Sequence, residues 1–136
     1  MSIDAIVGIA SSALDAQSQR ITLLAQNLAN ADSINSPGGG PYQRRVPVFA
    51  PAPVGEGAAA GIGVQVAAVL TDNAPPQQNF DPSSPFADEA GMVKEPSINP
   101  VYEMVDLMQA SRSYQTNLSV IETANTVTAK TLDLLK

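Results

Sequence analysis

The chain has 136 residues, enough for one domain, and its 13 acidic against 7 basic residues give a formal net charge of −6. It contains neither His nor Cys, which excludes Cys- and His-based nucleophilic catalysis and most zinc, copper and haem sites. The negative balance also argues against nucleic-acid binding, because phosphate recognition needs a basic surface.

The residues that break helices are concentrated in the middle of the chain. All 11 Pro, and every one of the 9 Gly except Gly8, lie between Pro37 and Pro100. Because Pro and Gly end helices, the sequence predicts a helix over 1–35, a helix over 100–136 and an irregular central region over 36–99.

The first segment, 1–35, carries an unbroken heptad pattern, which predicts one continuous helical seam. The seam positions are Ile3, Val7, Ala10, Leu14, Gln17, Ile21, Leu24, Leu28 and Ala31. Ser2 is the expected N-cap, and the helix is expected to stop near Asn35, before Pro37. The apolar stretch 5–10 is short and no basic residue precedes Arg20, so we expect neither a cleaved signal peptide nor a membrane span.

The central region, 36–99, is predicted to consist of loops with some β-strand. Residues 42–49 and 63–71 alternate loosely and are expected to pair as a β-hairpin across the Pro-, Gly- and Ala-rich stretch 50–62. We expect 72–100 to be extended and poorly regular. Its apolar side chains are expected to act as anchors: Phe80, Phe86, Met92, Val93 and Ile98.

The last segment, 100–136, repeats the heptad pattern. Its seam positions are Met104, Leu107, Ser111, Tyr114, Leu118, Ile121, Asn125, Thr128, Leu132 and Leu135. Asn99 as N-cap, followed by Pro100 at the first helical position, predicts where this helix begins.

Neither helix can bury its seam alone. We therefore expect the two helices to pair with each other and with helices of neighbouring subunits, since two helices make a small core for a chain of this length. The expected fold class is mainly α, with a coiled coil of the two terminal helices and a central segment that contains a β-hairpin. The expected packing interface comprises Val7, Leu14, Ile21, Leu24, Leu28, Met104, Leu107, Tyr114, Leu118, Ile121, Leu132 and Leu135.

Two stretches resemble chemical sites but lack the necessary context. The Gly-rich run 55–63 follows prolines and precedes a strand, whereas a phosphate-binding loop follows a strand and opens a helix. The acidic residues Asp81, Asp88, Glu89 and Glu95 lack the spacing of a calcium loop. Arg44 and Arg45 are only weak support for an acidic partner. We therefore expect no catalytic, cofactor or metal site and no small-molecule substrate.

Several motifs resemble those of the bacterial flagellar rod and hook proteins. Asn27-Leu28-Ala29-Asn30 is similar to the motif that ends their first helix, and 103–117 is similar to their C-terminal motif. The stretches 39–45, 81–85, 87–88, 91–93 and 96–99 resemble the C-type proximal rod branch of the family. The B type is the alternative, and Gly39-Gly40-Pro41-Tyr42 argues against it. The motif residues carried over are Asn27, Ala29, Asn30, Tyr42, Glu103, Met104, Arg112, Tyr114 and Asn117.

The resemblance implies a structural role rather than an enzyme. It implies a subunit of the periplasmic rod in the flagellar basal body, which leaves the cytoplasm through the flagellar type III export apparatus without a cleaved signal. Its partners would be other rod proteins and copies of itself, with Phe49, Phe80 and Phe86 directed outward to neighbours. A soluble export chaperone or adaptor built as a helical hairpin is the alternative that the residues leave open.

Overall fold

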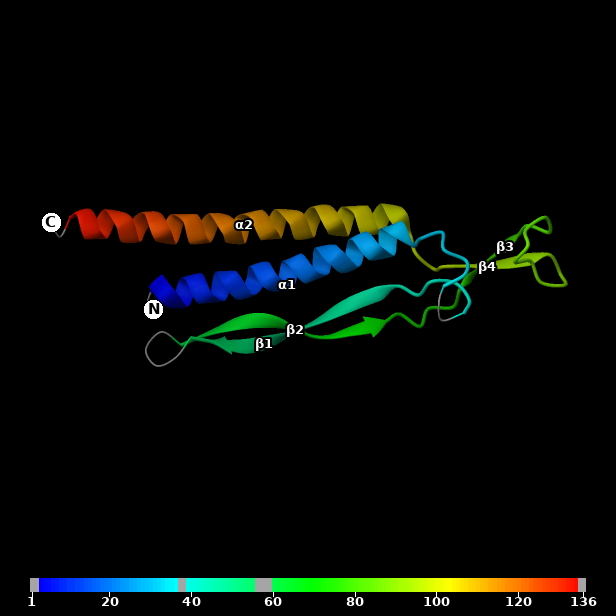
Figure 1. Ribbon diagram of the computed structural model, residues 1–136, viewed down its shortest axis with the longest axis horizontal. Coiled ribbons are helices and arrows are strands. Elements are labelled where there is room, and N and C mark those ends of the chain that lie inside the picture. Colours follow the sequence, from blue (N-terminus) through cyan, green and yellow to red (C-terminus); the bar gives the residue numbers. More distant parts are fainter. Residues whose placement is uncertain (1–2, 37–38, 56–59, 135–136) are drawn as a thin grey trace.

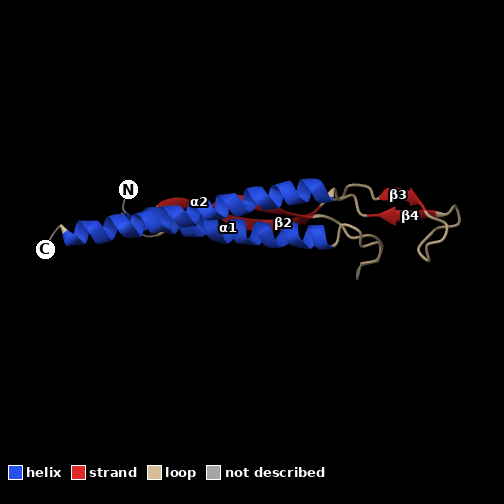
Figure 2. Cartoon of the chain, turned by 90° about the horizontal axis from the view of Figure 1, so that it is seen from above, coloured by secondary structure: helices blue, strands red, loops and turns tan. Residues whose placement is uncertain are grey.

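The computed structural model describes residues 3–36, 39–55 and 60–134. Its elements in chain order are α1 (Ile3–Ala29), β1 (Arg45–Val54), β2 (Gly61–Thr71), β3 (Gln77–Phe80), β4 (Met92–Glu95) and α2 (Pro100–Asp133). The molecule is elongated, with α1 and α2 side by side in opposite directions and the β1–β2 hairpin along the other side of α1 (Figure 1). The β3–β4 hairpin projects from one end, and the last turns of α2 extend beyond the start of α1 at the other (Figure 2).

This arrangement confirms two terminal helices with a central β-hairpin, but the helix α1 is shorter than expected. It ends at Ala29 rather than near Asn35. The N–H of Asn30 is shared between the carbonyl oxygens of Gln26 and Asn27, and the N–H of Ser33 bonds to the carbonyl of Asn30. Side chains add further hydrogen bonds to this turn, because the Asn30 Nδ2 donates to the Gln26 carbonyl and the Ser33 hydroxyl donates to the Asn30 Oδ1. The expected N-cap, Ser2, lies outside the described residues.

The start of α2 is as predicted. Asn99 has an extended backbone, and its Oδ1 accepts hydrogen bonds from the N–H groups of Val101 and Tyr102 at 3.0 and 3.4 Å. Pro100 occupies the first turn, where its missing N–H has no helical partner to lose. The helix continues to Asp133, and Leu135 lies outside the described residues.

The buried stripe of α2 is offset from the predicted seam. Its fully buried residues are Glu103, Ala110 and Ala124, and Leu107, Tyr114 and Ile121 are half-buried between them. Three other seam residues are largely solvent-exposed: Met104, Leu118 and Leu132 are 50, 41 and 58% exposed. Small alanines allow close approach to α1, whereas Met104 and Leu118, each one position from the stripe, remain on the surface. Leu132 is in the last turn of α2, and the last turns extend beyond the start of α1 (Figure 2). The two helices pack antiparallel, and the buried stripe of α2 keeps Leu107, Tyr114 and Ile121 of the predicted seam while its alternate positions lie one residue earlier than predicted.

The β1–β2 hairpin is longer than predicted. The two strands pair antiparallel from Arg45 opposite Thr71 to Val54 opposite Gly61, with an irregularity between Val48 and Phe49. Three prolines lie within β1, which a two-stranded sheet tolerates because each strand has a free edge. Residues 56–59 of the Gly-rich run lie outside the described residues.

The expectation that 72–100 is irregular was wrong. β3 and β4 form a second antiparallel hairpin, from Gln77 opposite Glu95 to Phe80 opposite Met92. The run Gln77-Gln78-Asn79 has no apolar alternation to signal a strand, and the hairpin is closed instead by turn chemistry. Asp81 is an example: its N–H bonds to the Gly91 carbonyl, and the hydrogen bond from the Ser83 hydroxyl to its carboxylate lowers the Asp81 pKa. Of the expected anchors, Val93 and Ile98 are buried, whereas Phe80 and Phe86 are exposed.

The β1–β2 hairpin packs on α1 through Gly63. A Cβ added at Gly63 would overlap the Ser12 Oγ and would lie 3.0 Å from the Ser12 Cβ. That hydroxyl donates to the Ile9 carbonyl and accepts from the Val64 N–H, so it is held in place from both sides. The Ser12 side chain therefore occupies the space that any residue other than Gly would need.

Gly63→Ala is expected to destabilise the chain by about 1–3 kcal/mol, the usual result of forcing an extra methyl group into a packed contact. Gly8→Ala is the matched control on the facing helix, because a Cβ there meets Val54 at an ordinary 3.8 Å. It should be neutral or stabilising by up to about 1 kcal/mol, since Ala favours helix over Gly. Urea unfolding followed by circular dichroism measures both, and equal midpoints for the two variants would contradict the prediction.

Candidate assembly interface and its buried polar network

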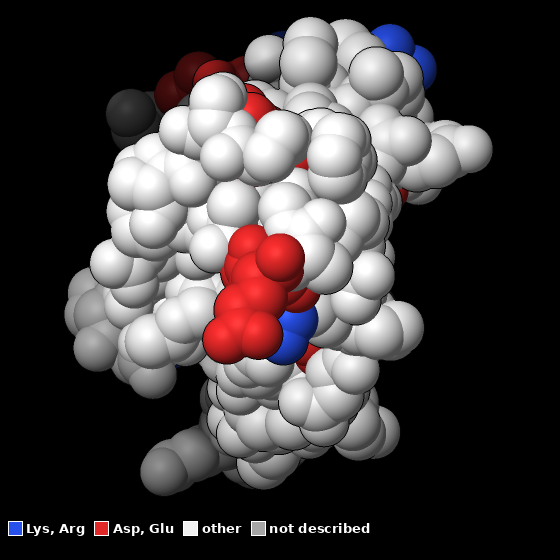
Figure 3. Space-filling view, turned by 90° about the vertical axis from the view of Figure 1, so that its right-hand side faces the viewer, with Lys and Arg blue, Asp and Glu red and all other residues white. Residues whose placement is uncertain are grey.

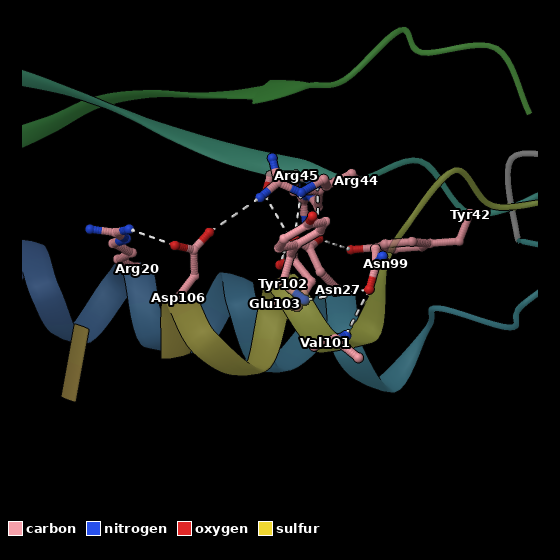
Figure 4. A network of polar contacts seen from close by, with 10 residues as sticks. All are labelled: Arg20, Asn27, Tyr42, Arg44, Arg45, Asn99, Val101, Tyr102, Glu103 and Asp106. Atoms are coloured by element: carbon pink, nitrogen blue, oxygen red, sulfur yellow. Dashed lines mark hydrogen bonds and ion pairs between the residues drawn. The ribbon is translucent and has the colours of Figure 1, made fainter. Parts of the chain in front are cut away.

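A buried polar network joins α1, the segment 42–45 and α2 (Figure 4). Asn27, which is fully buried, is at its centre. Its Nδ2 donates to the Arg45 carbonyl at 2.9 Å and to the Glu103 Oε2 at 3.1 Å. Its Oδ1 accepts from the Arg45 N–H at 2.9 Å and from the Tyr42 hydroxyl at 3.2 Å. Two donors and two acceptor positions are thus occupied, which is the full capacity of an amide side chain.

Charged groups complete the network. Glu103 is 2% exposed, and its Oε1 accepts a hydrogen bond from the Arg44 Nε. Arg44 also lies 3.8 Å from Asp106, which lies 3.6 Å from Arg20 on α1. Two carboxylates and two guanidiniums balance, so the buried Glu103 charge is paired and hydrogen-bonded, as a buried charge must be. Burial raises the pKa of Tyr42, with Arg45 opposing the shift and Glu103 adding to it.

The network contains three of the motif residues singled out from the sequence. Asn27, Tyr42 and Glu103 meet here although they come from three separate segments. The others lie elsewhere: Ala29 and Asn30 at the end of α1, Met104 on the outer surface, and Arg112, Tyr114 and Asn117 further along α2.

Sequence reasoning missed Arg20 and Asp106 as network members and placed the partner of Arg44 outside the chain. The Arg44-Arg45 pair suggested an acidic partner, and the structure shows Glu103 and Asp106 of the same chain in that role for Arg44. The sequence shows Arg44 two residues after Tyr42, and Glu103 and Asp106 spaced to share one helical face, but no linear pattern indicates that the two segments meet.

The outer surface of α2 carries large exposed hydrophobic side chains. Four of them recur at helical spacing near the start of the helix and a fifth lies further along: Val101, Met104, Val105, Met108 and Leu118. We call this set the outer apolar face. Near the start of α1, Ile3 and Ile6 line an apolar groove together with Val120, Ala124 and Val127 of α2. Contiguous exposed apolar surface of this kind marks an interaction site.

The end of the molecule that carries β3 and β4 differs from this groove in the charge of its surface. Seen from the side that carries β3 and β4, the surface is mostly uncharged, with acidic side chains gathered near the centre of the view (Figure 3). Within the described residues, no group of three or more His, Cys, Asp or Glu side chains is placed to hold a metal ion. Over the same residues, neither helix is long and apolar enough to cross a membrane.

Comparison with known proteins decides the family. A family profile described as the flagellar basal body rod FlgEFG protein C-terminal region matches residues 89–134, which include β4 and α2. The flagellar basal-body rod protein FlgC of Escherichia coli O157:H7 is 48% identical over 95% of both chains. The chain belongs to the FlgC family of flagellar basal-body rod proteins.

Further relatives extend the match across distant bacteria. FlgC of Salmonella typhimurium is 46% identical over 95% of both chains. FlgC of Borreliella burgdorferi is 34% identical over 100% of this chain and 99% of its own. The likeness to FlgC proteins therefore includes both helices, the hairpins and the segment that supplies Tyr42 and Arg44, and it agrees with the C type inferred from the sequence motifs.

Proposed function

We propose that this chain is a structural subunit of the proximal rod in the flagellar basal body. The observation that best supports this proposal is the outer apolar face of α2, which an isolated chain would leave exposed to water. Similar proteins over nearly the whole length are named as basal-body rod proteins, which supports a structural subunit rather than an enzyme.

The terminal helices are the proposed assembly elements. Leu24 is buried within the chain, and Val7, Leu14, Ile21 and Leu28 are half-buried. Met104, Leu118 and Leu132, which do not reach the buried stripe, would pack against helices of neighbouring rod subunits. A contact between two different patches that does not close on itself produces a helical array. Torque would then pass through many apolar contacts, in coiled-coil fashion, rather than through a single bond.

We further propose a route by which the chain reaches the rod, and contacts that its hairpins make with neighbouring subunits. The chain would leave the cytoplasm unfolded through the flagellar type III export apparatus and fold on reaching the growing rod. The exposed Phe49, Phe80 and Phe86 would contact neighbours from the hairpins. We propose no nucleic-acid partner and no substrate.

Met108→Glu tests the proposal, because Met108 is 61% exposed and belongs to the outer apolar face. A charge there costs the isolated chain little but must be desolvated when a neighbour covers it. We expect loss of swimming in soft agar and absence of rods from isolated basal bodies, with export of the chain and its urea midpoint unchanged.

Gln109→Glu is the matched control: it adds the same carboxylate to the adjacent exposed position of the same helix. It should leave swimming close to that of the parent. Normal swimming of the Met108→Glu strain would show that the outer apolar face does not carry assembly.

A further inference from the structure

Apolar packing leaves the register between α1 and α2 poorly determined. The buried stripe of α2 repeats its character every heptad, with a large half-buried residue followed by a smaller one: Leu107 and Ala110, Tyr114 and Asn117, Ile121 and Ala124. A shift of α2 by one heptad would put a large residue where a large one had been, and would exchange Ala with Asn at the smaller positions. Repetitive seams of this kind allow alternative registers unless a polar contact selects one.

The Asn27–Glu103 contact is the buried part of the α1–α2 interface that does not repeat; the half-exposed Arg20–Asp106 ion pair, with Ser113 one heptad after Asp106, is the other. Seven residues after Glu103 the stripe holds Ala110, which has no acceptor for the Asn27 amide. The Asn27 Oδ1 also accepts hydrogen bonds from the Arg45 N–H and the Tyr42 hydroxyl. These partners belong to the segment 42–45, which would not move with α2 if α2 shifted along α1. A shifted register would leave a buried amide and a buried carboxylate without partners, which proteins avoid.

We propose that Asn27 and Glu103 are register-determining residues: their buried contact selects one alignment of α2 on α1 among several that the apolar stripe would accept. Arg44 acts with them by pairing the second carboxylate oxygen of Glu103. Polar residues at single seam positions determine register in coiled coils in the same way, at some expense of stability.

The alignment decides which side chains of α2 face outward. In the observed register Met104, Met108 and Leu118 belong to the outer apolar face. A shifted helix would present the same face at a different height along the molecule. That consequence for assembly rests on the proposed function, whereas the choice of register is a property of the chain itself.

Cysteine cross-linking measures the register directly, because the chain has no Cys of its own. Ile6→Cys is combined in turn with a single Cys at each position of α2 from 113 to 130, and the purified full-length chain is oxidised. Ile6 shares its groove with Val120, Thr123, Ala124 and Val127. The parent should therefore give one maximum of cross-linking within 120–127.

The decisive variant is Asn27→Leu combined with Glu103→Leu, which replaces the polar contact by apolar side chains. We expect a second maximum about seven residues from the first, with the parental maximum reduced at least twofold. Glu103→Gln keeps a carbonyl oxygen that can accept from the Asn27 amide, so it should keep the single maximum. The matched control is Gln26→Leu with Glu122→Leu, two exposed positions on the same helices, which should also keep it.

A single unchanged maximum in the variant with leucine at both 27 and 103 would overturn the proposal. A flat profile in that variant would overturn it too, since the contact would then be needed for docking rather than for register, and so would a flat profile in the parent. None of these outcomes depends on rod assembly. Failure of the Met108→Glu test would instead contradict the proposed function and leave the register unaffected.

Discussion

Asn27→Ala is expected to lower the free energy of unfolding by about 3 kcal/mol, because each buried partner left without a hydrogen bond costs about 1–3 kcal/mol and several lose theirs at once. The groups affected are the Arg45 N–H and carbonyl, the Tyr42 hydroxyl and the Glu103 carboxylate. Urea unfolding of the purified chain, followed by circular dichroism of its helices, measures the change.

Asn30→Ala provides the control within the same motif. The Asn30 side chain makes only local hydrogen bonds: its Nδ2 donates to the Gln26 carbonyl and its Oδ1 accepts from the Ser33 hydroxyl. Water can replace both, so the substitution should change stability by no more than about 1 kcal/mol. Asn27→Asp is a second comparison: its carboxylate still accepts from Tyr42 and from the Arg45 N–H, but it donates neither to Glu103 nor to the Arg45 carbonyl. An Asn27→Ala variant as stable as Asn30→Ala would show that the network adds nothing to stability.

Leu24→Asp is expected to be at least as disruptive, lowering stability by about 4 kcal/mol or more. Leu24 is 4% exposed in the middle layer of the molecule, and a carboxylate there would be buried or would force α1 away from its neighbours. We expect weak helical circular dichroism at room temperature and no cooperative unfolding. Cells carrying the variant should export the chain but build no rod.

Ala25→Asp separates the effect of burial from the effect of charge. It places the same carboxylate at the adjacent, exposed position of the same helix. The variant should retain cooperative unfolding within about 1 kcal/mol of the parent, the difference reflecting the lower helix propensity of Asp. Cooperative folding of Leu24→Asp itself, at parental stability, would contradict the burial assigned to Leu24.

Local signals in the sequence predicted the helices well and the second hairpin not at all. Asn99 followed by Pro100 marks the start of α2 by chemistry that acts within one turn, and the structure shows those hydrogen bonds. The end of α1 was placed too late because the prediction used the next helix breaker, Pro37, as the stop, whereas the helix ends at Ala29 and the buried Ala31 lies beyond it. The β3 strand was not predicted because three of its four residues, Gln77, Gln78 and Asn79, are polar, and turns at Asp81 and Asp88 close the hairpin.

The buried polar network could likewise be predicted only in part. Motif resemblance selected Asn27, Tyr42 and Glu103, but nothing in a linear pattern says that residues so far apart meet, or that Arg44 and Asp106 join them. The predicted seam of α2 rested on heptad spacing alone, which does not distinguish neighbouring stripes. It included large residues such as Met104 and Leu118, whereas the packed pair buries small alanines and leaves those larger residues on the surface.

By itself the sequence determined where helices could form, because the absence of Pro and Gly at both ends and the cap at Asn99 act on neighbouring residues only. Only the tertiary structure decided which face of α2 is buried and which is offered to neighbours. Helix periodicity allows several stripes, and the choice among them depends on how closely the backbones approach and where the buried groups of Asn27 and Glu103 find partners.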